Sequence, residues 1–295
     1  MQIKWRLFNN CNFHCSYCCN SVMNKVQNPI NFDRLLRIAK SIHNLIEKDE
    51  DDVFEVNLIG GEITMLPLEQ MKEIINTIYS KKITKFHITS NMSAKVDYYI
   101  AINELCNKLN VTLKIVGSFH EEMMNYDVFI KKARMLSDNL KLFIAEFVVT
   151  SENKEIYEKI QEDCKKYNIA LMVDYNRKEK WETNDIDYDN RSIKNYLRII
   201  LNPQGCICSN SKYMINVLPH GEVYGTVCHN RKLLGMINMI KSFPHEEFIC
   251  KQKICSFCGK IEIKTPQQEI LYSNINNIIV NEDLIKKHNE EINVI

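Results

Sequence analysis

Three cysteines near the start of the chain, Cys11, Cys15 and Cys18, have the most informative spacing in the sequence, Cys-Asn-Phe-His-Cys-Ser-Tyr-Cys. Three thiolates this close together can hold three irons of a cubane [4Fe–4S] cluster and leave the fourth iron without a protein ligand. An iron with open coordination positions binds a substrate or a cofactor, so the spacing predicts a reactive cluster. Zinc is the alternative, with His14 or Cys19 as fourth ligand, although zinc sites more often pair two close ligands with two others.

A second short run can bring the backbone close to a ligand. Gly60-Gly61-Glu62 follows residues 53–59, whose apolar content predicts a buried strand. Glycine has no Cβ, so a glycine pair at a strand end lets the chain approach a bound group closely. An ordinary strand-to-helix turn is the alternative interpretation, because a glycine pair alone is a weak signal.

Both runs belong to a regular alternation of predicted strands and helices. Strands are predicted at 3–8, 53–59, 84–90, 111–118, 140–149 and 169–175, and helices at 32–48, 67–81, 97–109, 126–138 and 153–167. Strands separated by helices pair in parallel through right-handed crossovers, so six units predict an α/β fold with a partial (β/α)6 TIM-like barrel. Asp97 and Ser151 are the expected N-caps of two helices. In such folds the chemistry collects at the carboxyl ends of the strands, where both runs lie.

The cysteine triplet, the aromatic Tyr17 before its last member and the Gly-Gly-Glu run one β/α unit later resemble the signature of the radical S-adenosylmethionine (SAM) superfamily. The resemblance implies a [4Fe–4S] cluster on the triplet, with SAM at the open iron. It implies cleavage of SAM to methionine and a 5′-deoxyadenosyl radical, which removes a hydrogen atom from the substrate. It also implies an electron donor such as a reductase, a flavodoxin or a ferredoxin.

The resemblance further implies contacts with SAM. The backbone of the Gly-Gly-Glu run would meet the amino group of the methionine part, polar groups at strand ends would reach the ribose, and apolar residues of the fifth strand would flank the adenine. The expected cofactor-binding residues are Tyr17, Gly60, Gly61, Glu62, Ser90, Asn91, Ser118 and Val148. Those at strand ends could equally be caps or core residues.

The catalytic side chains are not identified by any spacing, so candidates rest on position. His120, Glu146 and Tyr175 are expected at the barrel mouth, together with His87 and Asp174. The alternative for a lone histidine such as His120 is an ordinary surface or core residue, which is the commoner case.

The rear of the chain holds a further group of cysteines. A hairpin predicted around Pro219-His220-Gly221 would bring Cys208 and Cys228 to the same end, and Cys255 and Cys258 supply a close pair. These four resemble the ligands of the twitch or SPASM extensions of radical SAM enzymes, which implies one auxiliary [4Fe–4S] cluster. Cys250 is an alternate ligand and Cys206 is spare; zinc is the alternative metal.

The predicted organisation follows from these motifs. It comprises a radical SAM barrel at 1–180, a linker and helix at 181–202, a small cysteine-rich twitch/SPASM-like domain at 203–258, and a C-terminal segment at 259–295.

Composition excludes several classes of protein. The chain has 295 residues, of which 45% are hydrophobic, so it can bury a large core. A formal net charge of +1 gives no electrostatic case for binding nucleic acid or an anionic membrane. The sequence contains neither an apolar stretch of membrane-spanning length nor a secretory signal, which predicts a cytoplasmic protein. In that compartment the twelve cysteines predict metal ligands and buried thiols rather than disulfides.

Three functions are compatible with these features. The first is an enzyme that abstracts hydrogen from a small metabolite, possible examples being sugar- or nucleotide-linked compounds, because no extra domain that would grip a peptide leader precedes the first strand. The second is a peptide (RiPP) maturase that forms a cross-link, a thioether or an epimerised residue. The third is a non-catalytic iron–sulfur or zinc binding protein, which needs neither an open iron nor a Gly-Gly-Glu loop.

Overall fold

The computed structural model describes residues 1–18, 29–51, 53–176, 207–208, 213–225, 233–243, 248–249 and 261–262. The predicted linker and helix at 181–202 lie outside these residues, and the segment at 259–295 is described only at 261–262. Five of the rear cysteines also lie outside: Cys206, Cys228, Cys250, Cys255 and Cys258.

Six parallel strands form most of the main sheet and lie side by side in chain order, with β6 at one edge. They are β1 (Gln2–Arg6), β2 (Phe54–Ile59), β3 (Ile83–Ser90), β4 (Thr112–Phe119), β5 (Leu142–Val149) and β6 (Ala170–Tyr175). Each connection contains one helix: α2 (Phe32–Lys48), α3 (Leu68–Ile78), α4 (Val96–Lys108), α5 (Tyr126–Asn139) or α6 (Lys154–Lys166). The α/β class and the six parallel strands are confirmed, with element ends within three residues of those predicted.

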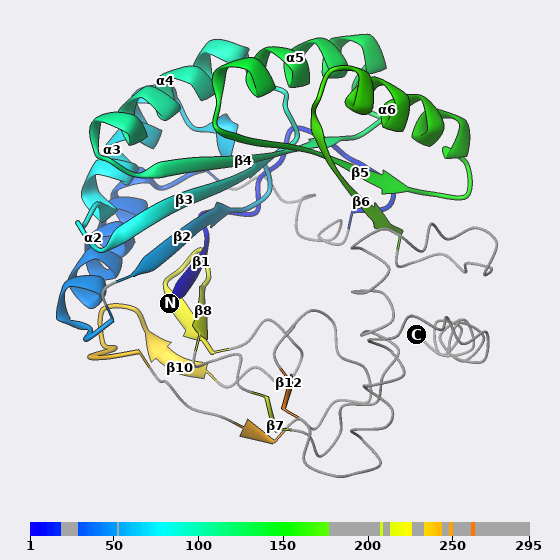
Figure 1. Ribbon diagram of the computed structural model, residues 1–295. Coiled ribbons are helices and arrows are strands. Elements are labelled where there is room, and N and C mark those ends of the chain that lie inside the picture. Colours follow the sequence, from blue (N-terminus) through cyan, green and yellow to red (C-terminus); the bar gives the residue numbers. More distant parts are fainter. Residues whose placement is uncertain are drawn as a thin grey trace.

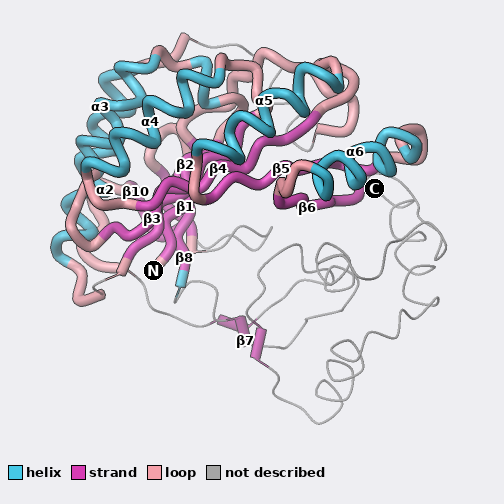
Figure 2. Tube along the Cα trace, turned by 45° about the horizontal axis from the view of Figure 1, so that its top comes forward, coloured by secondary structure: helices cyan, strands magenta, loops and turns pink. Residues whose placement is uncertain are grey.

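The sheet is curved, and its helices cover the convex face (Figures 1 and 2). Successive strand residues point to opposite faces, and the residues on the convex side are apolar. Trp5, Phe86 and Phe147 are among those fully buried beneath the helices. None of the described helices is long and apolar enough to cross a membrane.

Both predicted helix caps are wrong. Lys95 precedes α4 and Asn153 precedes α6, so neither Asp97 nor Ser151 is an N-cap. Asp97 instead lies in the first turn of α4, where its negative charge interacts favourably with the helix dipole and stabilises the helix. The Asn153 side chain accepts a hydrogen bond from the Thr150 backbone N–H at 2.7 Å, so it stabilises the turn after β5 rather than capping α6.

A hairpin from the rear of the chain extends the main sheet at its β1 edge. Strand β8 (Met214–Val217) pairs in parallel with β1 and antiparallel with β9 (Glu222–Tyr224), which in turn pairs with β10 (Leu233–Met236). The hairpin predicted around Gly221 is therefore confirmed, and this glycine has a φ of 95°, a conformation that side chains disfavour. A second, three-stranded sheet has the order β11 (Phe248–Ile249), β7 (Ile207–Cys208), β12 (Ile261–Glu262).

Candidate functional site

The predicted cysteine triplet lies on the loop that follows β1. Cys11 and Cys15 are each 7% exposed and pack with Phe13, and the more exposed Cys18 packs against the same group. The Phe13 backbone N–H donates to the Cys11 sulfur at 3.4 Å, and the Asn91 side-chain amide donates to it at 3.8 Å. The structure thus brings the three predicted ligands together on one loop.

The chemistry of these thiols fits a bound metal cluster. Burial is the main cause that raises the pKa of Cys11 and the pKa of Cys15, the latter to about 11. Buried thiolates need positive charge nearby, which iron supplies when it displaces the thiol protons. The two N–H groups that donate to the Cys11 sulfur would stabilise it as a metal-bound thiolate.

The Gly-Gly-Glu run lies directly against the loop that carries the triplet. The Gly61 N–H donates to the Phe8 carbonyl at 3.0 Å, and the Glu62 N–H donates to the Asn10 carbonyl at 2.7 Å. A Cβ on Gly60 would lie 2.7 Å from the Phe8 carbonyl oxygen, and one on Gly61 would lie 1.9 Å from that of Asn10. Both glycines are therefore required by the close approach of two backbone segments.

The Glu62 side chain is fully buried and serves as an acceptor for its surroundings. Its Oε1 accepts from the Thr64 backbone at 2.9 Å, the Thr64 hydroxyl at 2.6 Å and the Ser90 hydroxyl at 2.9 Å, while its Oε2 accepts from the Asn91 backbone at 2.5 Å. The Ser90 hydroxyl also bonds the Tyr99 hydroxyl at 2.7 Å. Burial raises the pKa of Glu62, and these hydrogen bonds oppose that effect. The predicted residues Glu62, Ser90 and Asn91 are thus one network that joins the ends of β2 and β3.

The loop after β4 clamps the cysteine loop from the other side. The Glu122 carboxylate accepts hydrogen bonds from the backbone and the hydroxyl of Ser16, at 2.7 and 2.5 Å. The His120 ring stacks on Tyr17, bonds its hydroxyl through Nδ1 at 3.1 Å, and meets Phe13 edge-on. Burial lowers the pKa of His120 to about 4, so the ring is neutral at neutral pH. Sequence reasoning missed Glu122, because no local pattern shows which residue a strand-end carboxylate reaches.

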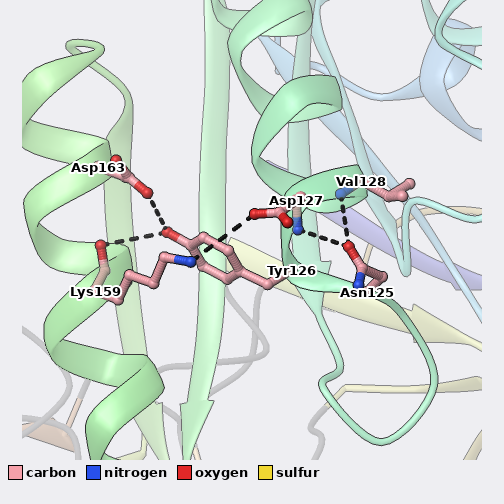
Figure 3. A network of polar contacts seen from close by, with 6 residues as sticks. All are labelled: Asn125, Tyr126, Asp127, Val128, Lys159 and Asp163. Carbon is pink, nitrogen blue, oxygen red and sulfur yellow. Dashed lines mark hydrogen bonds and ion pairs between the residues drawn. The ribbon is translucent and has the colours of Figure 1, made fainter.

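The base of this clamping loop is itself anchored (Figure 3). Asn125 caps α5 by accepting from two backbone N–H groups of its first turn, at 2.9 and 3.3 Å. The next residue, Tyr126, donates from its hydroxyl to Asp163 on α6 at 2.7 Å, and its ring packs on Phe119 at the end of β4. The Lys159 ammonium lies 4.2 Å from the centre of the same ring. The loop after β4, which contacts the cysteine loop, is therefore anchored to α5 and α6.

The other predicted residues have different positions. Ser118 and Glu146 are register partners near the ends of β4 and β5, and the Ser118 hydroxyl donates to the Glu146 carboxylate. Val148 on β5 lies opposite Asp174 on β6. Only the backbone of Tyr175 is described, as the last residue of β6.

The expectation that His87 lies at the mouth is wrong. Its register partner on β4 is Lys114, four residues before Ser118, so His87 lies deeper in the sheet than the pair of Ser118 and Glu146. Of the four predicted rear ligands only Cys208 falls in the described part of the chain, and it pairs through its backbone with Phe248 and Ile261.

Comparisons with known proteins agree with this geometry. The family model of the radical SAM superfamily matches residues 5–164. A search of curated proteins gives no match.

Several solved structures share the fold at low sequence identity. Native anSMEcpe with bound AdoMet is 14% identical, with a TM-score of 0.57 over 81% of this chain and 79% of that one. Native anSMEcpe with bound AdoMet and Cp18Cys peptide is 16% identical, with a TM-score of 0.55 over 81% and 78%. Streptococcus suis SuiB bound to precursor peptide SuiA is 15% identical, with a TM-score of 0.51 over 79% of this chain and 62% of that one.

Proposed function

The chain belongs to the radical SAM superfamily, and from that membership we propose that it holds a [4Fe–4S] cluster and SAM and abstracts a hydrogen atom from a substrate. When bound, this pair supplies the reductive cleavage of SAM to methionine and a 5′-deoxyadenosyl radical. The observation that carries the proposal is the packed group of Cys11, Cys15 and the partly buried Cys18 on one loop, held between the Gly-Gly-Glu run and the loop after β4. The cluster-bound enzyme would have the partial (β/α)6 barrel as its catalytic domain.

The residues of this chain then have separate roles. Cys11, Cys15 and Cys18 would hold the cluster, and backbone carbonyls of the Gly60–Glu62 run would accept hydrogen bonds from the amino group of SAM. The Glu62 side chain positions that run through the ends of β2 and β3, so it acts on the cofactor indirectly.

Three further predicted positions complete the proposed SAM site. Asn91 and Ser118 lie at the ends of neighbouring strands, where they can reach the ribose, and Val148 can flank the adenine. Tyr17 is stacked on His120, so His120 is proposed to support the cofactor loop rather than to touch the substrate. Glu146 remains the candidate for contact with the substrate.

The test compares two sets of cysteine variants. Protein reconstituted anaerobically with iron and sulfide should convert SAM to 5′-deoxyadenosine and methionine when dithionite is added. Replacing Cys11, Cys15 and Cys18 by Ala should abolish that product, whereas Cys106→Ala, a buried thiol on α4, should retain it. Product formation by the triple variant would refute the proposal.

Two classes of substrate are compatible with the proposal. A small metabolite, such as a sugar- or nucleotide-linked compound, is the first. A peptide is the second, and the observation in its favour is that similar folds include anSMEcpe with a bound peptide and SuiB with its precursor peptide. Incubation with phosphorylated sugars, with nucleotides and with peptides encoded beside the gene would separate the two.

An auxiliary [4Fe–4S] cluster in a twitch/SPASM-like domain is also part of the proposal, with Cys208, Cys228, Cys255 and Cys258 as ligands and Cys250 as alternate. Support comes from the backbone: Cys208 pairs with Phe248 and Ile261, which flank Cys250, Cys255 and Cys258 in sequence. About eight irons per chain would fit two clusters. Four irons with one zinc would assign the rear site to zinc, and four irons alone would exclude it.

A further inference from the structure

The loop that follows β3, residues 91–94, fixes the position of Asn91, one of the proposed SAM contacts. The Asn91 backbone N–H donates to the Glu62 carboxylate at 2.5 Å. Its side-chain amide donates to the Asn12 side chain at 3.0 Å and to the Cys11 sulfur at 3.8 Å. Asn91 therefore joins the Gly-Gly-Glu run to the cysteine loop, and a change in the path of its own loop would displace it from both.

The conformation of this loop is not one that its sequence favours. Met92 has a φ of 61°, in the left-handed region that residues with a bulky side chain seldom adopt. Its side chain is fully buried, and its backbone N–H donates to the Ser90 hydroxyl at 3.1 Å. A residue in such a conformation persists only where its surroundings hold it. Contacts from outside the loop are therefore needed to keep this path.

One ammonium group supplies such contacts. Lys132 of α5 donates to the carbonyl oxygens of Met92 at 2.7 Å, Ser93 at 3.3 Å and Ala94 at 2.8 Å. Helix α5 can reach them because it packs beside α4, the helix that follows the loop (Figure 1). An ammonium group has three N–H donors, so three consecutive carbonyls use its full capacity. None of the ion pairs in the described part of the chain includes Lys132, so carbonyl dipoles rather than a carboxylate stabilise its charge there.

We propose that Lys132 is a positioning residue for SAM: its ammonium occupies a cation site made of three backbone carbonyls and so holds Asn91 where it contacts the cofactor. The inference rests on the proposed function for the identity of the ligand. Without the ammonium, the repulsion between three converging carbonyls adds to the unfavourable φ of Met92. The loop then populates other conformations, and the affinity for SAM falls with the fraction of molecules that keep the competent one.

The test removes the ammonium and then returns it as a separate molecule. Lys132→Ala deletes the side chain beyond Cβ, and propylammonium replaces the deleted atoms. Calorimetry on the full chain, reconstituted with its cluster, should give an affinity for SAM that is about tenfold weaker in this variant. Propylammonium should restore most of that affinity, whereas 1-propanol, which has no charge, should not. Lys132→Met fills the same space with an uncharged side chain, so it should bind SAM as weakly and should not respond to propylammonium.

Further measurements separate positioning from a general loss of structure. Lys131→Ala, at an exposed neighbour on α5, is the matched control and should leave the affinity for SAM unchanged. The KM for SAM should rise in Lys132→Ala while kcat for SAM cleavage stays within about twofold of the wild type, because the lost interaction acts on binding. Amide hydrogen exchange without SAM should be faster at residues 91–94 and unchanged in β4.

The outcomes decide the proposal. Wild-type affinity for SAM in folded Lys132→Ala and Lys132→Met overturns it, as does equal rescue by propylammonium and 1-propanol. If neither variant folds, Lys132→Arg decides, because a planar guanidinium keeps the charge but does not place three donors on one point. That variant should have a lowered affinity for SAM, and wild-type affinity would overturn the proposal. Wild-type protein that does not bind SAM refutes the proposed function instead. Hydrogen exchange of Lys132→Ala with and without propylammonium then tests the role of the ammonium in the loop by itself.

Discussion

Two groups of buried polar side chains lie on the same sheet and differ in one respect. The Glu62 carboxylate accepts four hydrogen bonds from Thr64, Ser90 and Asn91. The strand register also brings Asn57, His87 and Asn216, which we call the polar row, to one face of the sheet, and each has a buried atom without a hydrogen-bond partner in the described structure. A satisfied network holds two strand ends in one arrangement, whereas an unsatisfied row costs stability. The first group therefore stabilises the fold, whereas the unpartnered atoms of the second lower its stability.

Removing the satisfied acceptor should have the largest effect. Glu62→Ala leaves buried donors of Thr64, Ser90 and Asn91 without an acceptor, which should lower the free energy of unfolding by about 3–5 kcal/mol. Urea unfolding at neutral pH measures this. Glu69→Ala, whose side chain is exposed on α3, is the control and should change the free energy by less than about 0.5 kcal/mol. Equal effects for the two variants would contradict a structural role for Glu62.

Acid should destabilise the protein through His87. Burial, then Lys114 and Lys4, lower the pKa of its ring to about 4, while Glu55 raises it and Lys85 lowers it. The unfolded chain, with a pKa near the ordinary 6.5, binds more protons between these values, so stability falls as pH drops from about 6.5 to about 4. The loss should be on the order of 3 kcal/mol.

His87→Gln tests this pH dependence, because it removes the titrating group. The variant should lose less free energy of unfolding between pH 7 and pH 4 than the wild type does. His43→Gln is the control, since its ring bonds a backbone carbonyl at 2.8 Å on the helix side. An equal loss of unfolding free energy between pH 7 and pH 4 in wild type and His87→Gln would show that His87 is not the group responsible.

Gly61→Ala should cost an intermediate amount. The new Cβ would lie 1.9 Å from the Asn10 carbonyl oxygen, so two backbone segments must separate, at a cost of about 1–3 kcal/mol. The amount of iron that the reconstituted Gly61→Ala variant retains should also be lower than in the wild type. Gly117→Ala is the contrasting variant, because its Cβ would meet the side chains of Met92 at 2.7 Å and Phe143 at 3.0 Å rather than a backbone segment. A larger loss in Gly117→Ala would contradict this explanation.

The smallest effect is expected in the polar row. Asn57→Leu removes a buried acceptor that has no described partner, so stability should change by less than about 1 kcal/mol or rise. Asn153→Leu is the contrasting variant, because its side chain accepts from Thr150 at 2.7 Å and donates to the Val148 carbonyl at 2.9 Å. It should cost about 1–3 kcal/mol. Thermal and urea unfolding of both variants would show whether the contrast holds.

Local patterns in the sequence predicted the elements but not their long-range contacts. The apolar strands, the helical periodicity of 32–48 and the spacing of Cys11, Cys15 and Cys18 are all visible within a few residues. The clamp of Glu122 on Ser16 joins residues that are 106 positions apart. The depth of a residue in the sheet depends on strand register, which a local pattern does not give. His87 was therefore wrongly expected at the mouth. Such contacts depend on tertiary packing, which a local pattern does not encode.

The pairing of β8 with β1 has a consequence for synthesis of the chain. Ile3 pairs with Ile215, so the ribosome must add about 210 residues before this edge of the sheet can be covered. At about 5–20 residues per second, the delay is roughly 10–40 s. During that time the first strand to emerge presents open backbone groups to other chains, which favours aggregation. Slow synthesis and scarce chaperones should therefore lower the yield of this protein more than that of a fold whose first strand is covered early.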